Sequence, residues 1–302
     1  IDLTAPTEEE GSNWTPIGNS DSNQYTGTFD GAGYTVSGID IDHGSSNYQG
    51  FFGTIGNGGM VKGLTVTGKV TGNSYVGGIA GQNNSGTLVA CYSQVAVKGG
   101  YYTGGIAGHN SSGTLTACYS TGTVTGTGSD IGGIAGQNYN GTLTGCYPTN
   151  NKVFGTEGGA TDGNGVSSFE DLNENYLKQM NFAIIVYNAK ASFPYHYVAS
   201  TTPTSGLPTL ADGVSELEDF FTLAEEAGTN KSPVCLIGTA DDLSRFATLV
   251  NTGGDYLKLN ATLTAEITLP TGTNNWTPIG NSSAKYTGTF DGAGYTVSGI
   301  DI

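Results

Sequence analysis

The chain has 302 residues, of which 50 are glycine, and its 26 acidic and 10 basic side chains give a formal net charge of −16. This acidic balance argues against nucleic acid or an anionic membrane as a partner, because both need a basic surface. The longest apolar run, residues 183–187, is far too short to cross a bilayer. With 17 Tyr and 11 Phe at regular spacing, the sequence is also unlike a disordered chain.

Two periods recur along the chain. The shorter one, of 27 or 28 residues, brings back a GGIAG motif, an Asn/Gly-rich turn, a Thr-Leu pair and a Cys-Tyr pair in three consecutive copies. A degenerate earlier copy lies at residues 50–70. The longer period repeats WTPIGNS (14–20) and YTGTFDGAGYTVSGIDI (25–41) after 262 and 261 residues. The sequence therefore predicts one full unit and the opening of a second, taken from a tandem array.

The short period predicts one coil of a β-solenoid, because it combines short alternating segments with Gly/Asn turns and shows no helical pattern. Equivalent residues of stacked coils lie about 4.8 Å apart. Apolar and cysteine ladders are therefore expected inside the stack, and an asparagine ladder at a corner. These ladders are Ile79/Ile106/Ile134, Leu88/Leu115/Leu143, Cys91/Cys118/Cys146 and Asn83/Asn110/Asn138.

The cysteines of the ladder are predicted to be free, buried thiols, since Leu64 fills the same position in the degenerate coil. By strand alternation, the tyrosine that follows each cysteine faces outward. Tyr92, Tyr119 and Tyr147 are therefore the candidate ligand surface. Two interpretations remain open: an aromatic stack that covers a strand edge, or a platform for a sugar ring or a partner protein.

Four segments are predicted along the chain. They are β-helix coils at 1–165, a closing segment of helix plus strand at 166–212, an acidic linker at 213–232, and a capping helix with the opening strands of a second unit at 233–302. The expected elements are helices at 167–189 and 239–251, a weakly helical stretch at 214–227, and strands at 193–199, 233–237 and 257–269. Thr239 and Asp242 form a capping box for the second helix. A helix before the first coil would cover the open end of a solenoid.

The motifs FDGAGYTVSGIDI, GFFGTIGNGGMVKGLTV and YVGGIAGQNNSGTL together resemble the GLUG-motif repeat family of bacterial surface proteins. The resemblance covers residues 13–150 well and residues 239–251 with the following strands moderately. It implies a right-handed parallel β-helix, export to the bacterial cell surface and an adhesin-like role. The family motif is structural and supplies no catalytic residue.

The inventory of side chains argues against catalysis. Residues 44–160 contain four Lys and no Arg, too few for a lyase that must neutralise a uronate. The same coils hold only Asp130 and Glu157, too far apart in coil register for the carboxylate pair of a glycosidase. His43, His109 and His196 are isolated, so no metal or cofactor is expected.

We therefore expect a non-catalytic, extracellular adhesin or scaffold that presents a rigid binding surface. Its surface partner, a protein or a glycan, is not identified by the sequence, and head-to-tail contact between tandem units is a further expectation. One alternative is a carbohydrate-binding module that uses the tyrosine row. A polysaccharide-cleaving enzyme is the third hypothesis.

Overall fold

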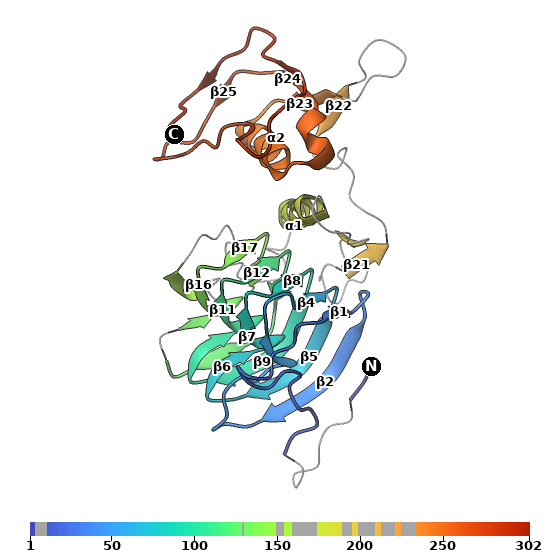
Figure 1. Ribbon diagram of the computed structural model, residues 1–302, viewed down its shortest axis with the longest axis vertical. Coiled ribbons are helices and arrows are strands. Elements are labelled where there is room, and N and C mark those ends of the chain that lie inside the picture. Colours follow the sequence, from blue (N-terminus) through green and yellow to red (C-terminus); the bar gives the residue numbers. More distant parts are fainter. Residues whose placement is uncertain are drawn as a thin grey trace. The chain divides into compact units, whose positions relative to one another are not determined.

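The computed structural model describes residues 1–3, 11–128, 130–148, 154–158, 174–188, 195–198, 209–212, 221–224 and 234–302. The chain forms two compact units. One comprises residues 1–184 and 194–213, and the other comprises residues 185–193 and 214–302. Figure 1 colours the coils of the first unit from blue to green and most of the second unit orange to red. The finer division into four segments stays a prediction.

The first unit is built from stacked β-coils whose strands form four parallel sheets, with each strand beside the equivalent strand of the next coil (Figure 1). The first sheet contains β1 (Thr28–Asp30), β4 (Met60–Lys62), β8 (Thr87–Val89), β12 (Thr114–Thr116) and β17 (Thr142–Thr144), and the second contains β6 (Ser74–Gly77), β10 (Tyr101–Gly104) and β15 (Ile131–Gly132). The third contains β3 (Phe52–Ile55), β7 (Ala80–Asn84), β11 (Ala107–Ser111), β16 (Ala135–Tyr139) and β19 (Phe154–Gly158). The fourth contains β2 (Thr35–Asp42), β5 (Thr65–Thr71), β9 (Tyr92–Gly99), β13 (Tyr119–Ser120), β14 (Val124–Gly126) and β18 (Tyr147–Pro148).

The strand registers confirm the predicted period and the predicted parallel β-helix. Leu115 of β12 pairs with Leu88 of β8 on one side and with Leu143 of β17 on the other. In the fourth sheet, Tyr119 lies between Tyr92 and Tyr147 in the same way. Each of these steps is one repeat of 27 or 28 residues, so one repeat makes one coil.

The predicted apolar and cysteine ladders lie inside the stack. The Ile79/Ile106/Ile134 ladder is fully buried, and the leucine ladder is at most 2% exposed. The three ladder cysteines are buried and free, as predicted. The Sγ of Cys118 donates to the backbone oxygens of Leu88 and Thr116. Burial raises the pKa of the Cys118 thiol well above its usual value, so this thiol stays protonated.

The predicted asparagine ladder forms, and its side chains are buried. Asn83, Asn110 and Asn138 are each 0% exposed. Asn83 Nδ2 donates to Asn110 Oδ1 over 2.8 Å, and Asn110 Nδ2 donates to Asn138 Oδ1 over 2.7 Å. Each Nδ2 also donates to a glycine carbonyl three residues later. A Cβ at one of these glycines, Gly113, would clash with the amide of Asn83. Only glycine therefore fits at this position of the turn.

Alternation along β9 confirms the predicted inward face of the last strand. Ser93, Val95 and Val97 are buried, whereas Gln94 and Ala96 are exposed. Apolar side chains on one face and polar ones on the other are the pattern of a strand packed against a core on one side only.

Aromatic rings and two ion pairs hold the first coil on the second. Trp14 stacks on Phe51 with 4.5 Å between ring centroids, and its Nε1 donates to the Phe51 carbonyl over 3.0 Å. Phe29 meets Phe51 edge to face at 5.7 Å. Two lysines of the second coil pair with acids of the first: Lys62 with Asp30 at 3.2 Å, and Lys69 with Asp40 at 3.0 Å.

A closing segment follows the coils. Helix α1 spans Glu174–Asn188, and β20 (Tyr195–Val198) pairs antiparallel with β21 (Thr209–Asp212). The helix and β20 are joined by Asn181, whose side chain exchanges two hydrogen bonds with the backbone of Tyr197. The expected helix at 167–189 is thus confirmed over 174–188 and the expected strand at 193–199 over 195–198. Their remaining residues lie outside the described part of the chain.

The second unit combines a short sheet with a helix. Strands β22 (Thr222–Ala224), β23 (Val234–Ile237), β24 (Asn260–Leu263) and β26 (Phe290–Asp291) form one sheet, and β25 (Ile267–Thr268) pairs with β27 (Val297–Ser298). Helix α2 (Ala240–Thr252) and a 3₁₀ turn, η3 (Gly254–Lys258), lie between β23 and β24. The predicted capping box is confirmed, because Thr239 Oγ1 accepts from the Asp242 N–H and Asp242 Oδ2 accepts from the Thr239 N–H.

One expectation in this unit is wrong. Residues 222–224, placed in a weakly helical stretch, form β22, which pairs antiparallel with β23. The tertiary pairing outweighs the weak helical preference of the segment. The strands expected at 233–237 and within 257–269 are confirmed as β23, β24 and β25.

Candidate functional site

The predicted tyrosine surface forms a ladder but is not exposed. Tyr92 and Tyr119 stack with 4.1 Å between ring centroids and 7° between ring planes. Their exposed fractions are 8% and 1%, and that of Tyr147 is 1%. The prediction of an outward-facing stack is therefore right about stacking and wrong about exposure. Burial raises the pKa of the Tyr92 phenol to about 12, although its hydrogen bond to Thr121 acts in the opposite direction.

The closing segment is what covers this ladder. Tyr197 of β20 meets Tyr119 edge to face at 5.7 Å, and its hydroxyl donates to the Ala117 carbonyl over 2.9 Å. At the next coil, the Tyr147 hydroxyl donates to Oε1 of Gln179 in α1. Alternation gives the direction of a side chain relative to its own coil, but it does not show which later segment will pack against that face. The ladder is thus part of the contact between the coils and their closing segment.

A second row of tyrosines is accessible at the surface, and the sequence analysis missed it. Tyr48, Tyr75 and Tyr102 stack with centroid distances of 4.9 and 5.0 Å and interplanar angles of 10° and 26°. All three are partly exposed and have φ between 53° and 58°, in the left-handed region. The signal was in the YxGGIAG repeat, where Tyr75 and Tyr102 precede the glycines by two residues.

A row of neutral polar side chains lies beside these tyrosines. His109 pairs in register with Gln82 on one side and Gln137 on the other. The imidazole ring lies 5.7 Å from the ring of Tyr75 and 5.5 Å from that of Tyr102. The Nδ1 atom of His109 lies 3.4 Å from the Nε2 atom of Gln82. We call these six residues, Tyr48, Tyr75, Tyr102, Gln82, His109 and Gln137, the tyrosine face.

The chemistry of the tyrosine face is hydrogen bonding by neutral groups. Both ring faces of Tyr75 are covered by its neighbours in the stack, so this tyrosine offers an edge and a hydroxyl instead of a flat platform. The Tyr48 hydroxyl donates to Asp21 Oδ2 over 2.6 Å at one end of the row. Burial lowers the pKa of His109, an effect that Asp130 partly opposes, which keeps the imidazole neutral at pH 7.

The lowered pKa of His109 predicts an acid-sensitive stability. Well above the usual histidine pKa near 6.5, neither the folded nor the unfolded chain carries charge at this position. As the pH falls further, the unfolded chain takes up the proton first, so the free energy of unfolding decreases. We expect His109→Gln, which copies both neighbouring coils, to reduce this loss. Urea midpoints measured above and below pH 6.5 would contradict the assignment if both proteins lost stability equally.

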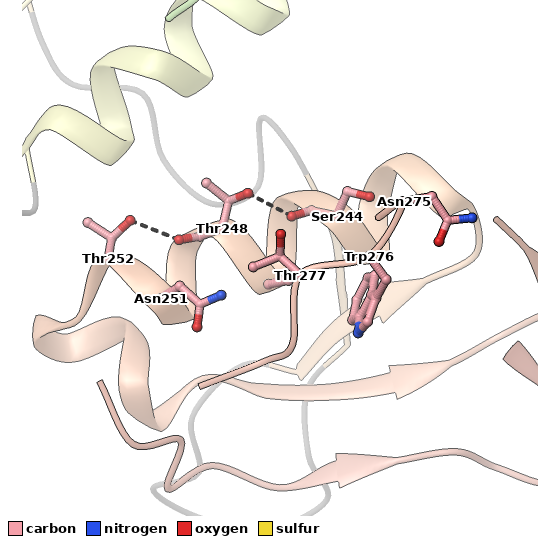
Figure 2. Close-up of a pocket in the computed structure, with 8 residues that line it drawn as sticks. Ser244, Thr248, Asn251, Thr252, Asn275, Trp276 and Thr277 are labelled. Carbon is pink, nitrogen blue, oxygen red and sulfur yellow. Dashed lines mark hydrogen bonds between the residues drawn. The ribbon is translucent and has the colours of Figure 1, made fainter. Parts of the chain in front are cut away.

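A pocket of about 350 Å³ lies in the second unit between α2 and the start of the second repeat copy (Figure 2). Trp276 lies at this pocket together with polar residues of both segments. Asn251 uses its amide to donate to the Pro278 carbonyl and to accept from the Gly280 N–H. Thr248 and Thr252 donate to helix carbonyls one turn earlier. Asn251 thus holds the segment against the helix, and we assign no ligand to the pocket.

The described ranges offer neither a metal site nor a membrane span. Within them, no three His, Cys, Asp or Glu side chains gather in a metal-binding arrangement. Of the helices in the same ranges, neither combines the length and apolar character needed to cross a membrane. His43 and His109 are far apart in the coil register, and the side chain of His196 lies outside the described part of the chain.

Comparison with known proteins identifies a motif in the coils. Residues 99–125 match the family model described as the GLUG motif. These residues run from the end of β9 through β10, β11, β12 and β13 into β14 and make up one coil. The resemblance expected from the repeated sequence is therefore confirmed for this coil, and the family motif corresponds to one turn of the β-helix.

Similar sequences occur within two longer proteins. A protein of Evansella cellulosilytica named as a Gly-rich membrane protein is 40% identical over 87 residues, which is 28% of this chain and 10% of the relative. Halomucin of Haloquadratum walsbyi is 35% identical over 92 residues, 29% of this chain and 1% of the relative. The aligned parts thus make up a tenth or less of each relative. A Bacteroides ovatus structure named as an immunoglobulin A1 protease aligns with a TM-score of 0.44 and 18% identity, over 69% of this chain and 82% of its own.

Proposed function

We propose that this chain is a non-catalytic segment of a cell-surface protein, and that its β-helix presents the tyrosine face to an extracellular partner in the manner of an adhesin. Similarity to a Gly-rich membrane protein and to halomucin supports a location at the cell envelope. The observation that carries the proposal is the tyrosine face itself. It is a partly exposed row of aromatic and amide side chains held at fixed spacing by the sheets.

Rigidity suits such a surface. Tyr75 and Tyr102 are held by ring stacking, and their coils are joined by the parallel pairing of β6 with β10. Little conformational freedom is therefore lost when a partner binds, and this loss is a main cost of association. Tyrosine contributes large contact area with few rotatable bonds and is enriched at binding surfaces for that reason.

Carbohydrate binding is the second candidate function, and the composition of the tyrosine face favours it. Gln137 is neutral and partly exposed, and its amide can both donate and accept, as recognition of hydroxyl groups requires. Gln82 Oε1 and His109 Nε2 are buried beside it, so the remaining polar contacts come from the tyrosine hydroxyls. Stacking of a sugar on the buried Tyr92/Tyr119/Tyr147 ladder would need the closing segment to leave. A glycan is instead expected to meet the hydroxyl edges of Tyr48, Tyr75 and Tyr102.

The test is direct binding of the whole chain to a glycan array and to a panel of immobilised extracellular proteins. We expect Tyr75→Ala, at the centre of the row, to weaken the detected binding at least tenfold. Tyr75→Phe keeps the stack and removes the hydroxyl, so it separates packing from hydrogen bonding. Tyr34→Ala, which removes a tyrosine that is 76% exposed on the first coil, is the control.

Each outcome of this test decides something. Binding that is lost in Tyr75→Ala but kept in Tyr34→Ala supports the tyrosine face, and the array or the panel then names the class of partner. Binding that both variants retain places the partner elsewhere and contradicts the proposal. Release of new reducing ends from a bound polysaccharide would contradict the non-catalytic role.

A further inference from the structure

The tyrosine face has a carboxylate at each end of its tyrosine row. At one end, the Tyr48 hydroxyl donates to Asp21 Oδ2 over 2.6 Å. At the other end, Asp130 takes the position that follows Tyr102 in the row, because β10 and β15 pair in register directly after these two residues. Asp21 is exposed and Asp130 is partly exposed. The row of three tyrosines is therefore enclosed between two negative charges.

These two carboxylates influence the titratable groups of the tyrosine face. Burial is the main cause of the raised pKa values of Tyr48 and Tyr75, and the charge of Asp21 contributes to both. Burial lowers the pKa of His109, and the charge of Asp130 opposes this effect. A negative charge disfavours ionisation of a phenol and favours protonation of an imidazole. Both ends of the tyrosine face therefore lie in a negative electrostatic field.

The basic side chains of the described coils lie on other sheets. Lys62 belongs to the first sheet, and Lys69 and Lys98 belong to the fourth, whereas the tyrosine face runs along the second and third. The formal net charge of the chain is −16. Complementary charge accelerates the encounter with a partner and selects against partners of the wrong sign. The charge around the tyrosine face therefore favours a cationic partner.

The distance between the two carboxylates limits the shape of that partner. Tyr48, Tyr75 and Tyr102 occupy consecutive coils, and Asp130 lies on the next one. Three steps between neighbouring strands, each of about 4.8 Å, give about 14 Å along the stack. In an extended peptide, residues four positions apart lie on the same side, separated by about 13 to 14 Å. Two basic residues at this spacing would reach both carboxylates.

We propose that the tyrosine face binds an extended basic segment of an extracellular protein, with Lys or Arg at positions i and i+4. This inference rests on the proposed function of the tyrosine face and names its partner. One cation meets Asp21 and the other meets Asp130, while residue i+2 lies over the hydroxyl of Tyr75. A carboxylate offers about four acceptor positions, so the hydrogen bond from Tyr48 leaves Asp21 able to bind a cation.

The experiment is fluorescence anisotropy of the full chain with the labelled peptide Lys-Ser-Thr-Ser-Lys. The control peptide, Lys-Lys-Ser-Thr-Ser, has the same composition and charge but cannot span the two carboxylates. We expect the first peptide to bind more tightly. Added salt should weaken its binding, because exposed charges are screened beyond about 10 Å at about 0.1 M ionic strength.

The chain supplies a sharp variant for this test. Asp130→Tyr continues the row with the residue of the two preceding coils and removes the charge. We expect Asp130→Tyr and Asp21→Asn each to weaken peptide binding by about two- to fivefold, the effect of one exposed ion pair. Asp241→Asn removes one charge from the exposed surface of α2 and should leave the binding unchanged. If Asp130→Tyr loses its folded circular dichroism spectrum, Asp130→Asn serves in its place.

Three results would overturn the inference. The first is equal binding of the two peptides, and the second is full binding of the spaced peptide by Asp130→Tyr combined with Asp21→Asn. The third is a glycan or protein whose binding is lost in Tyr75→Ala but persists in that double variant and at high salt. This third result would leave the proposed function of the tyrosine face intact while excluding a basic partner.

Discussion

Asn110→Ala should lower the free energy of unfolding by about 3 kcal/mol or more, because it breaks the buried asparagine ladder at its centre. The change leaves Asn138 Oδ1 and the Gly113 carbonyl without the donor they have now. It also removes the acceptor of Asn83 Nδ2. A buried polar atom left without a partner costs about 1 to 3 kcal/mol, and water has little access to a position that is 0% exposed.

The matched control for this prediction is Asn84→Ala. Asn84 neighbours Asn83 on β7 but is only partly buried, so its loss should change stability by about 0.5 kcal/mol or less. Urea unfolding followed by circular dichroism measures both variants. Equal midpoints for the two variants would show that the ladder adds nothing to stability.

Phe52→Ala should cost about 3 to 5 kcal/mol, the usual range for removing a buried aromatic ring. Phe52 is 0% exposed and touches Tyr25, Phe29 and Phe51, with centroid distances of 5.0, 5.5 and 5.2 Å. The cavity would loosen the first coil, which stacks on the second through Trp14 and Phe51. We therefore expect the emission of Trp14 to shift to longer wavelength in a Trp276→Phe background.

The control for this second prediction is a smaller loss of volume at the same position. The strand register corrects the expectation from the repeat, because Phe52 pairs with Ala80, and Phe51 therefore lies at the position of Ile79. Phe52→Ile leaves a smaller cavity than Phe52→Ala, so it should lower the free energy of unfolding by less. Chemical denaturation measures both variants. Equal losses for the two variants would mean that the volume of the Phe52 ring does not determine the stability of this coil.

The repeat in the sequence was sufficient to predict the core ladders and the inward face of the strands. Recurrence of Cys91, Cys118 and Cys146 at a spacing of 27 and 28 residues placed them in one ladder, because in-register stacking leaves no other arrangement for equal side chains. The same reasoning located Ile79 and Leu88 in the core. Alternation then gave the inward face of β9, since a strand with one buried face has a strict period of two.

What the sequence could not supply was contact between parts that do not repeat. Burial of Tyr119 depends on Tyr197, which lies in a segment without a counterpart in the coils. Similarly, β22 forms because β23 offers an edge for pairing. The tyrosine face was missed for a different reason. Tyr48 belongs to no intact YxGGIAG motif, so only the stacking on Tyr75 shows that the row starts there.

Stacking by coils also determines how this chain would respond to mechanical load. In the four sheets of the described coils, each strand pairs with the equivalent strands one coil before and after it. A pulling force on one end would therefore detach coils in sequence, each releasing 27 or 28 residues, or about 90 Å of extended chain. Such stepwise lengthening would divide a sudden load among many small ruptures, while the coils that are still stacked keep their structure.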